Sequence, residues 1–135
     1  MPSTEKNLSS LLKQSLPKKS HYQRIENRAG EGMPDVYICL SGVPVWVELK
    51  IVKSNKVSVS KSQIAWHLAH TRCKGASFFL LYDPSTSDVF LFGGDKVLEI
   101  QGSRLDDLRP AALYIGKMDG LPCALRPAAL DMWGW

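Results

Sequence analysis

The chain has 135 residues, of which 44% are hydrophobic and 22% charged, a composition that suits one compact domain and leaves too little chain for a second. No apolar run is long enough to span a membrane, and no signal segment opens the sequence. The three cysteines, Cys39, Cys73 and Cys123, lack zinc-ligand spacing and are odd in number, so we expect a reduced protein of the cytoplasm.

Positive charge is concentrated in the first half of the chain. The net charge is +4, but residues 1–75 hold 12 Lys and Arg against 5 Asp and Glu, whereas residues 76–135 hold 5 against 8. A polyanionic partner such as DNA would explain this distribution, because Lys and Arg beside phosphates release counterions and add affinity. A solvated basic surface explains it equally well, so charge alone leaves both interpretations open.

A short helix and an ambiguous segment open the predicted fold. Ser3 or Thr4 can cap a helix that runs to about Leu16, where Pro17 stops it. Residues 21–27 are compatible either with a strand or with the end of a helix.

A pair of strands comes next. Residues 35–40 and 43–51 are both rich in β-forming side chains. The Ser41-Gly42 pair between them favours a tight hairpin turn. Residues 52–60 then form a polar, basic loop.

The second half of the predicted core is a helix followed by another pair of strands. Ser60 has the character of a helix N-cap, and the helix should run to about Cys73, with Gly75 as its stop. Residues 76–82 form a nearly continuous apolar run, which is typical of a buried strand. Residues 88–92 are predicted to form a further strand.

Beyond residue 93 the pattern weakens. Short helices are compatible with residues 95–101 and 104–108. The pentad RPAAL occurs at residues 109–113 and 126–130, but two copies do not make a repeat architecture.

The order of elements predicts an α/β fold with a mixed central β-sheet flanked by helices. We expect a single domain over residues 1–135. Its motif-bearing core covers about residues 20–92, and residues 93–135 are a C-terminal extension without an assigned role.

The proposed hairpin gathers three charged residues at one place. If the turn lies at residues 41–42, cross-strand partners have numbers that sum to 83, so Asp35 lies opposite Glu48. Glu48 and Lys50 are two apart on one strand and therefore share a face.

Two carboxylates and an ammonium on one face indicate a metal site. Close carboxylates repel each other unless a cation intervenes, and Mg²⁺ prefers oxygen ligands such as carboxylates, water and phosphate. The backbone carbonyl of Leu49 is near enough to be a further ligand. A bound metal polarises a phosphate and activates water, and Lys50 can orient that water or stabilise the developing charge. The pattern is that of phosphodiester hydrolysis.

At these residues the sequence resembles the PD-(D/E)XK nuclease superfamily. GMPD at residues 32–35 and WVELK at residues 46–50 are similar to its signature, and Gln63 on the next helix is similar to the glutamine that often follows it. The likeness is to the VRR-NUC and Holliday-junction-resolvase-like branch, including small phage endonucleases, and covers roughly residues 24–92. It implies a restriction-endonuclease-like core, Mg²⁺ or Mn²⁺ as cofactor, and homodimers that act on branched or nicked DNA.

The resemblance assigns roles residue by residue. Asp35 and Glu48 match the metal-binding acids, Lys50 the catalytic lysine, and Gln63 the helix residue that supports the site.

Family members often carry one more glutamate upstream. Glu26 is our first choice for it, although its spacing is short for the archaeal resolvases, and Glu5 on the first helix is the competitor. The number of metal ions, one or two, stays open.

Four side chains near the motif are candidate DNA contacts. Lys53, Lys56 and Lys61 form a basic stretch that can hold the phosphate backbone, or else they belong to an exposed flexible loop. His67 lies on the helix face that carries Gln63 and is expected to line the same cleft.

The sequence therefore predicts a metal-dependent DNA endonuclease that is specific for branched DNA such as Holliday junctions. A homodimer is expected, because symmetric branched DNA calls for two matched sites. We expect DNA as the partner, with no membrane and no small-molecule substrate. Two alternatives stay open: a general nicking or repair nuclease, and a non-catalytic DNA-binding module that keeps the nuclease fold.

Overall fold

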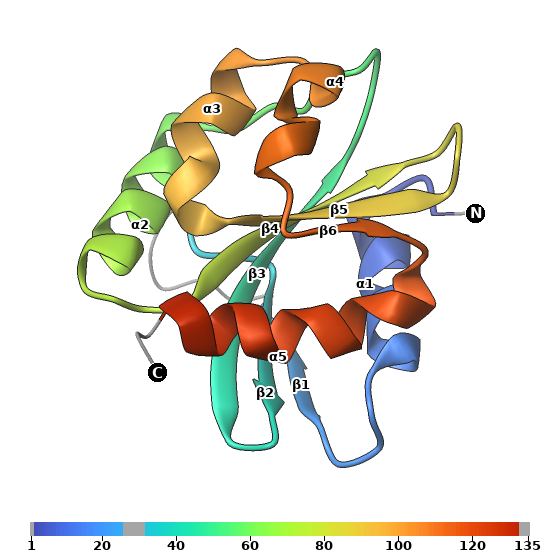
Figure 1. Cartoon of the computed structure of the whole chain (residues 1–135), viewed down its shortest axis with the longest axis vertical. Coiled ribbons are helices and arrows are strands. Elements are labelled where there is room, and N and C mark those ends of the chain that lie inside the picture. The colour runs from blue at the N-terminus through green and yellow to red at the C-terminus, as the bar shows by residue number, and fades with distance from the viewer. Residues whose placement is uncertain (1, 26–31, 133–135) are drawn as a thin grey trace.

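The computed structural model describes residues 2–25 and 32–132. At its centre is a six-stranded sheet whose strands lie in chain order from β1 to β6 (Figure 1). β3 and β4 pair in parallel, and the other neighbouring pairs are antiparallel. The strands are β1 (His21–Arg24), β2 (Val36–Leu40), β3 (Val43–Ile51), β4 (Ser77–Asp83), β5 (Asp88–Gly93) and β6 (Tyr114–Gly116).

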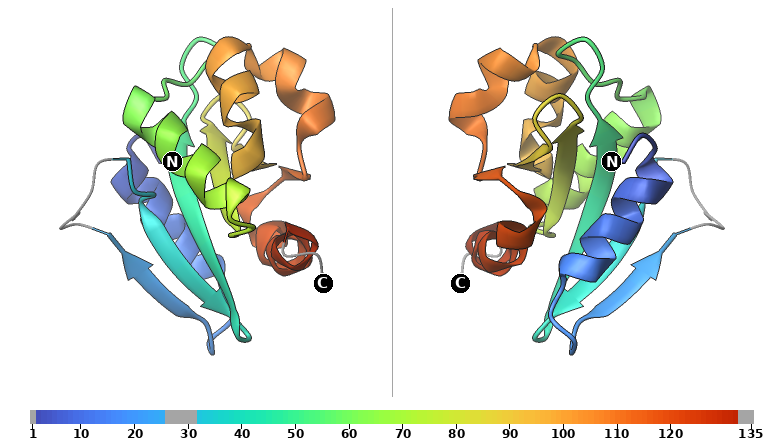
Figure 2. Two further views of the ribbon diagram at one scale, coloured as in Figure 1. Left: turned by 90° about the vertical axis from the view of Figure 1, so that its left-hand side faces the viewer. Right: turned by 90° about the vertical axis from the view of Figure 1, so that its right-hand side faces the viewer.

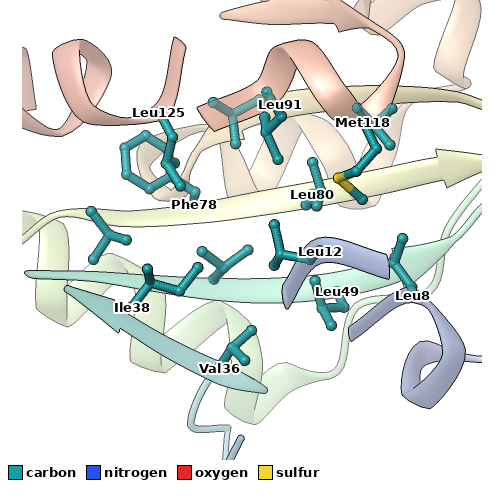
Figure 3. Close-up of a cluster of buried hydrophobic side chains, with 14 of the residues drawn as sticks. Leu8, Leu12, Val36, Ile38, Leu49, Phe78, Leu80, Leu91, Met118 and Leu125 are labelled. Atoms are coloured by element: carbon teal, nitrogen blue, oxygen red, sulfur yellow. The ribbon is translucent and has the colours of Figure 1, made fainter. Parts of the chain in front are cut away.

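Helices cover both faces of this sheet, which confirms the predicted α/β class with a mixed sheet. One face packs against α1 and α5 around Leu49 and Leu80 (Figure 3), and α1 lies beside β1–β3 (Figure 2). The other face packs against α2, α3 and α4 around Phe79 and Phe90. No helix in the described part of the chain is long and apolar enough to cross a membrane. The helices are α1 (Glu5–Ser15), α2 (Lys61–Arg72), α3 (Val97–Gly102), α4 (Leu105–Leu108) and α5 (Leu121–Met132).

A two-residue turn joins β2 to β3 and sets their register. Ser41 and Gly42 both have positive φ, 49° and 85°, which is the backbone of a tight hairpin whose twist matches its strands. Every pair from Val36–Val47 to the turn has numbers that sum to 83. The predicted register is therefore confirmed.

Helix α2 begins as predicted, with Ser60 as its N-cap, but its end differs in one detail. The residue with left-handed backbone is Lys74, with φ at 66°, and not Gly75. Gly75 instead makes room for a side chain, because a Cβ there would lie 2.3 Å from His70 Nε2. Gly75 still takes part in the helix end, because its backbone N–H donates to the His70 carbonyl oxygen at 3.0 Å.

Residues 93–132 complete the domain. β6 adds to the sheet beside β5, and α5 buries Leu121, Leu125 and Ala129 in the core that α1 also covers. Because α3 and α4 pack on the other face, the segment that the sequence left without a role covers part of both faces of the sheet.

Candidate active site

Asp35 is held against β3 at the start of β2. The register of the two strands, continued by one residue, places Asp35 opposite Glu48. Asp35 Oδ2 accepts a hydrogen bond of 2.9 Å from the backbone N–H of Leu49, and only 7% of the residue is exposed. The carboxylate is therefore fixed at the sheet face that carries Glu48.

Gln63 links Glu48 to Lys50. Both charged residues stand on one face of β3, and Glu48 is 2% exposed. Gln63 Nε2 donates to Glu48 Oε2 at 3.1 Å, and Gln63 Oε1 accepts from Lys50 Nζ at 2.9 Å. One amide serves both neighbours because its nitrogen donates and its oxygen accepts. The structure thus brings together the residues that the sequence nominated as the catalytic set.

The N-terminal turn of α2 fixes Gln63 in this position. Ser60 Oγ accepts from the backbone N–H of Gln63 at 3.2 Å, and Gln63 Oε1 accepts from the Ser60 N–H at 3.0 Å. These two bonds make a capping box. Gly32 presses against the same turn, since its φ is +82° and a Cβ there would lie 2.1 Å from the Ser62 carbonyl oxygen. The glycine of the GMPD motif therefore lets the segment before Asp35 approach α2.

One of the two candidates for the additional metal-binding glutamate lines a cavity of about 230 Å³ that Lys50 also lines. Glu5, the first residue of α1, lines this cavity together with Lys50, Lys53 and Lys56. Glu26 lies outside the described residues. Of the two candidates, the structure therefore locates only Glu5, at a cavity that Lys50 also lines.

The basic loop after β3 has a defined shape. The backbones of Lys53 and Lys56 exchange hydrogen bonds of 2.9 and 3.1 Å. Asn55, at the turn between them, accepts from the N–H of Leu105 with its carbonyl and donates to Asp106 Oδ2 with its side chain, at 2.8 and 3.1 Å. α4 therefore anchors the loop, and the side chains of Lys53 and Lys56 extend into solvent from it. Lys61 is also exposed, at the start of α2.

His67 does not reach the surface. Its exposed fraction is 0%, its Nδ1 hydrogen-bonds to Ser77 Oγ at 2.9 Å, and its ring lies 4.3 Å from that of Phe79. Burial, with a smaller electrostatic contribution from His70 and then Lys50, lowers the pKa of His67 to about 4. An enclosed imidazole has no surface for a phosphate, so the DNA contact expected at His67 is wrong. The helix face that the sequence assigned to a cleft lies against the sheet at this residue.

The donor chemistry of the acid pair fits a hard divalent cation. Within residues 2–25 and 32–132 there is no group of three or more His, Cys, Asp and Glu that could hold a metal. Asp35 and Glu48 nevertheless supply two nearly buried carboxylates at facing positions, and Leu49, whose carbonyl is the nominated backbone ligand, stands between Glu48 and Lys50. Mg²⁺ suits such a pair, because it binds through one or two carboxylates and keeps several waters.

Comparison with known proteins does not indicate a function for the chain. No protein-family model matches the chain, and no curated protein is significantly similar to it. A function is therefore indicated by the facing pair Asp35 and Glu48, with Lys50 joined to Glu48 by the amide of Gln63.

Proposed function

We propose that the chain is a metal-dependent endonuclease that hydrolyses phosphodiester bonds in DNA. The observation that carries this proposal is the contact of Gln63 with both Glu48 and Lys50, directly beside the fixed carboxylate of Asp35. Glu48 and Lys50, joined by this amide, and the facing Asp35 form a polar group in a sheet that is otherwise apolar at this level. Such a departure from good packing is expected where a protein performs chemistry.

Each residue has a distinct task in this proposal. Asp35 and Glu48 hold Mg²⁺, which would supply charge neutralisation at the phosphate and an activated water. Lys50 points its ammonium toward the reacting phosphate and stabilises the charge that develops there. Gln63 holds the side chains of Lys50 and Glu48 in place through its two hydrogen bonds, so it is a positioning residue. Glu26 stays our first choice for the further acid, and Glu5, which lines a cavity that Lys50 also lines, stays its competitor.

The basic side chains beside the site supply affinity for the DNA backbone. Lys53 and Lys56 are presented by an anchored turn, and Lys61 stands at the start of α2. Such contacts position a nucleic acid without reading its sequence. They support DNA as the partner of this site.

The finer assignment follows the sequence motifs. We propose a restriction-endonuclease-like core of the PD-(D/E)XK superfamily, a preference for branched DNA such as Holliday junctions, and a homodimer with two matched sites. The order of elements supports this core. The hairpin with the facing acids is followed by a helix that carries Gln63 and then by a strand parallel to β3.

Cleavage of defined DNA structures tests the proposal. Labelled four-way junction, nicked, single-stranded and linear duplex DNA would be incubated with wild type in Mg²⁺, Mn²⁺ or EDTA. We expect metal-dependent cutting, and we expect Asp35→Asn, Glu48→Gln and Lys50→Ala each to reduce it by at least about a hundredfold. Glu99→Gln, which alters an exposed carboxylate on α3, serves as the matched control and should cut normally. The ranking of substrates separates a junction resolvase from a general nicking nuclease.

The opposite outcome has a clear meaning. If wild type cuts none of these substrates, or if Glu48→Gln cuts as well as wild type, the catalytic assignment is wrong. Retained binding to the same DNA would then identify a non-catalytic DNA-binding module. Thermal unfolding adds a second criterion, because Mg²⁺ that binds the folded site must raise the melting temperature.

A further inference from the structure

A row of aromatic rings runs along the sheet face that carries the acids and continues onto α2. The row consists of His21 on β1, Tyr37 on β2, Trp46 on β3, and Trp66 and His70 on α2. Neighbouring ring centroids along it are 6.0, 5.2, 5.9 and 4.6 Å apart. The rings therefore form one continuous chain of ring contacts, which we call the aromatic row.

The aromatic row lies next to the candidate active site. Tyr37 is two residues from Asp35, and Trp46 is two residues from Glu48, so each ring shares a face with the neighbouring acid. Two residues along a strand span about 6–7 Å. Tyr37 and Trp46 pair directly across β2 and β3, which puts both rings one step from the facing carboxylates.

Filling the core does not account for these rings. The opposite face of β2 and β3 is closed, with Val36, Ile38 and Val45 fully buried against the rest of the core. On the aromatic side, α3 and α4 pack with β4 and β5, and Figure 2 shows β1 and β2 projecting beyond these two helices. Tyr37 and Trp46 are correspondingly only half-buried.

We propose that Tyr37 and Trp46 form a stacking platform for an unpaired nucleobase of the DNA strand whose phosphate lies at Asp35 and Glu48. Bases of every kind offer a flat π-face, and proteins that bind single strands combine aromatic platforms with a basic groove. The nearly parallel stack of His70 on Trp66, at 16° between ring planes, supports Trp46 from the side of α2.

Charge around the aromatic row favours a nucleic acid over a second copy of this chain. Lys50 and Lys61 stand at its active-site end, and Arg72 and Lys74 are exposed at the far end of α2. Two copies of this basic surface would repel each other, whereas a phosphate backbone would be attracted. Because a base inside a duplex hides its faces in the stack, the occupant is an unpaired base. The inference rests on the proposed function and deepens it, since it narrows the substrate to branched DNA that exposes an unpaired base beside the scissile phosphate.

Binding without cleavage tests the platform separately from the catalytic site. Fluorescence anisotropy would measure the affinity of wild type, in EDTA, for oligothymidylate of about ten residues and for an abasic phosphodiester of equal length. We expect thymidylate to bind more tightly. Tyr37→Ala and Trp46→Ala should each weaken thymidylate binding by about five- to a hundredfold and leave abasic binding unchanged, whereas Trp46→Phe should retain most of it. Leu98→Ala, which removes an exposed apolar side chain on α3, should have no effect.

Three results would overturn the platform. One is equal affinity for thymidylate and the abasic strand, which wild type alone decides even if Trp46→Ala does not fold. The second is a folded Trp46→Ala that binds thymidylate as wild type does. The third is dissociation of a dimer by Tyr37→Ala and Trp46→Ala without loss of DNA binding, which would make the aromatic row an interface between copies. Loss of cleavage with intact stacking would instead contradict only the catalytic proposal.

Discussion

β3 and β4 lie side by side in the sheet, yet they use the same face in opposite ways. Glu48 pairs with Phe79, and Lys50 pairs with Leu81. On β4 the two side chains are buried in the apolar cluster that α3 and α4 cover. On β3, at the same level of the sheet, the corresponding side chains are a carboxylate and an ammonium.

This contrast separates what the fold needs from what the chemistry needs. Phe79 shows that a large apolar side chain fits at this level and stabilises the sheet by burial. A buried carboxylate contributes no such stabilisation, because its desolvation offsets its hydrogen bonds. Glu48 is therefore a residue that the fold tolerates, and we infer that its function explains its presence.

The largest predicted effect sharpens this contrast directly. Phe79→Ala should lower the free energy of unfolding by about 3–5 kcal/mol, because it leaves a cavity in a close-packed cluster. Glu48→Gln should lower it clearly less, because it keeps the size and shape of the side chain and leaves no cavity. Urea unfolding of both variants measures the difference. Equal destabilisation by the two substitutions would make Glu48 a structural residue.

His67 breaks the apolar pattern on the β4 side, and its titration should appear in the stability of the protein. Burial lowers its pKa to about 4 in the folded state, against about 6.5 when unfolded. The unfolded chain thus binds a proton more readily between these values. The burial of neutral His67 therefore does not lower the free energy of unfolding above about pH 6.5. As the pH falls toward 4, that free energy decreases by up to roughly 3 kcal/mol, because the unfolded chain takes up the proton.

A double variant isolates this contribution. His67→Phe combined with Ser77→Ala removes the titrating ring and its hydrogen-bond partner together, so no buried hydroxyl is left unsatisfied. We expect its free energy of unfolding to fall less than that of wild type between pH 6.5 and 4.5. An unchanged pH dependence would show that other groups are responsible.

The sequence predicted the elements with strong local signals and missed those that depend on distant contacts. Residues 41–42 set the register of β2 and β3 through their own backbone preference, and the cap at Ser60 defined the start of α2. α5 was missed because Pro127 lies inside it. Burial of Leu125 against the sheet outweighs that local signal.

The repeated pentad RPAAL shows the same limit. Its first copy contributes to a short 3-10 turn over Arg109–Ala111, and its second lies within α5. Five residues that adopt two structures in one chain carry little local information. Neighbouring contacts decide their conformation.

The candidate site was predictable where strand geometry alone defines it. Alternation along β3 and the hairpin register were enough for Asp35, Glu48 and Lys50. The position of Glu5 beside Lys50 requires the docking of α1 on the sheet, which no local pattern encodes. The burial of His67 depends likewise on how α2 is rotated against β4.

Gly32 and Gly42 form a matched pair for the next prediction. Both have positive φ, +82° and +85°, but no atom would lie within 4 Å of a Cβ on Gly42, whereas one on Gly32 would meet the backbone of α2. Gly42→Ala should therefore cost about 1 kcal/mol, for its backbone conformation alone. Gly32→Ala should cost about 2 kcal/mol or more, because backbone must move.

Activity distinguishes these two glycines further. Displacing α2 moves Gln63 away from the acids, so Gly32→Ala should lose cleavage activity out of proportion to its stability. Gly42→Ala should cut DNA normally at a temperature where it is folded. Normal cutting by folded Gly32→Ala would show that the close approach to α2 does not position the site.

The smallest predicted effect on stability is that of substituting Gln63. This substitution distinguishes the two roles of the side chain, which caps α2 and holds Glu48 and Lys50. Gln63→Ala and Ser60→Ala both break the capping box, so each should lower the free energy of unfolding by about 1 kcal/mol. Only Gln63→Ala also removes the amide between Glu48 and Lys50. Cleavage should then fall about 10- to 100-fold in Gln63→Ala, as for residues that orient metal ligands, and much less in Ser60→Ala. Gln63→Glu replaces the donor to Glu48 with a second carboxylate, so its activity should be lower still at neutral pH. Equal activity of Gln63→Ala and Ser60→Ala would mean that Gln63 serves the helix alone, and that the charged pair on β3 keeps its geometry without it.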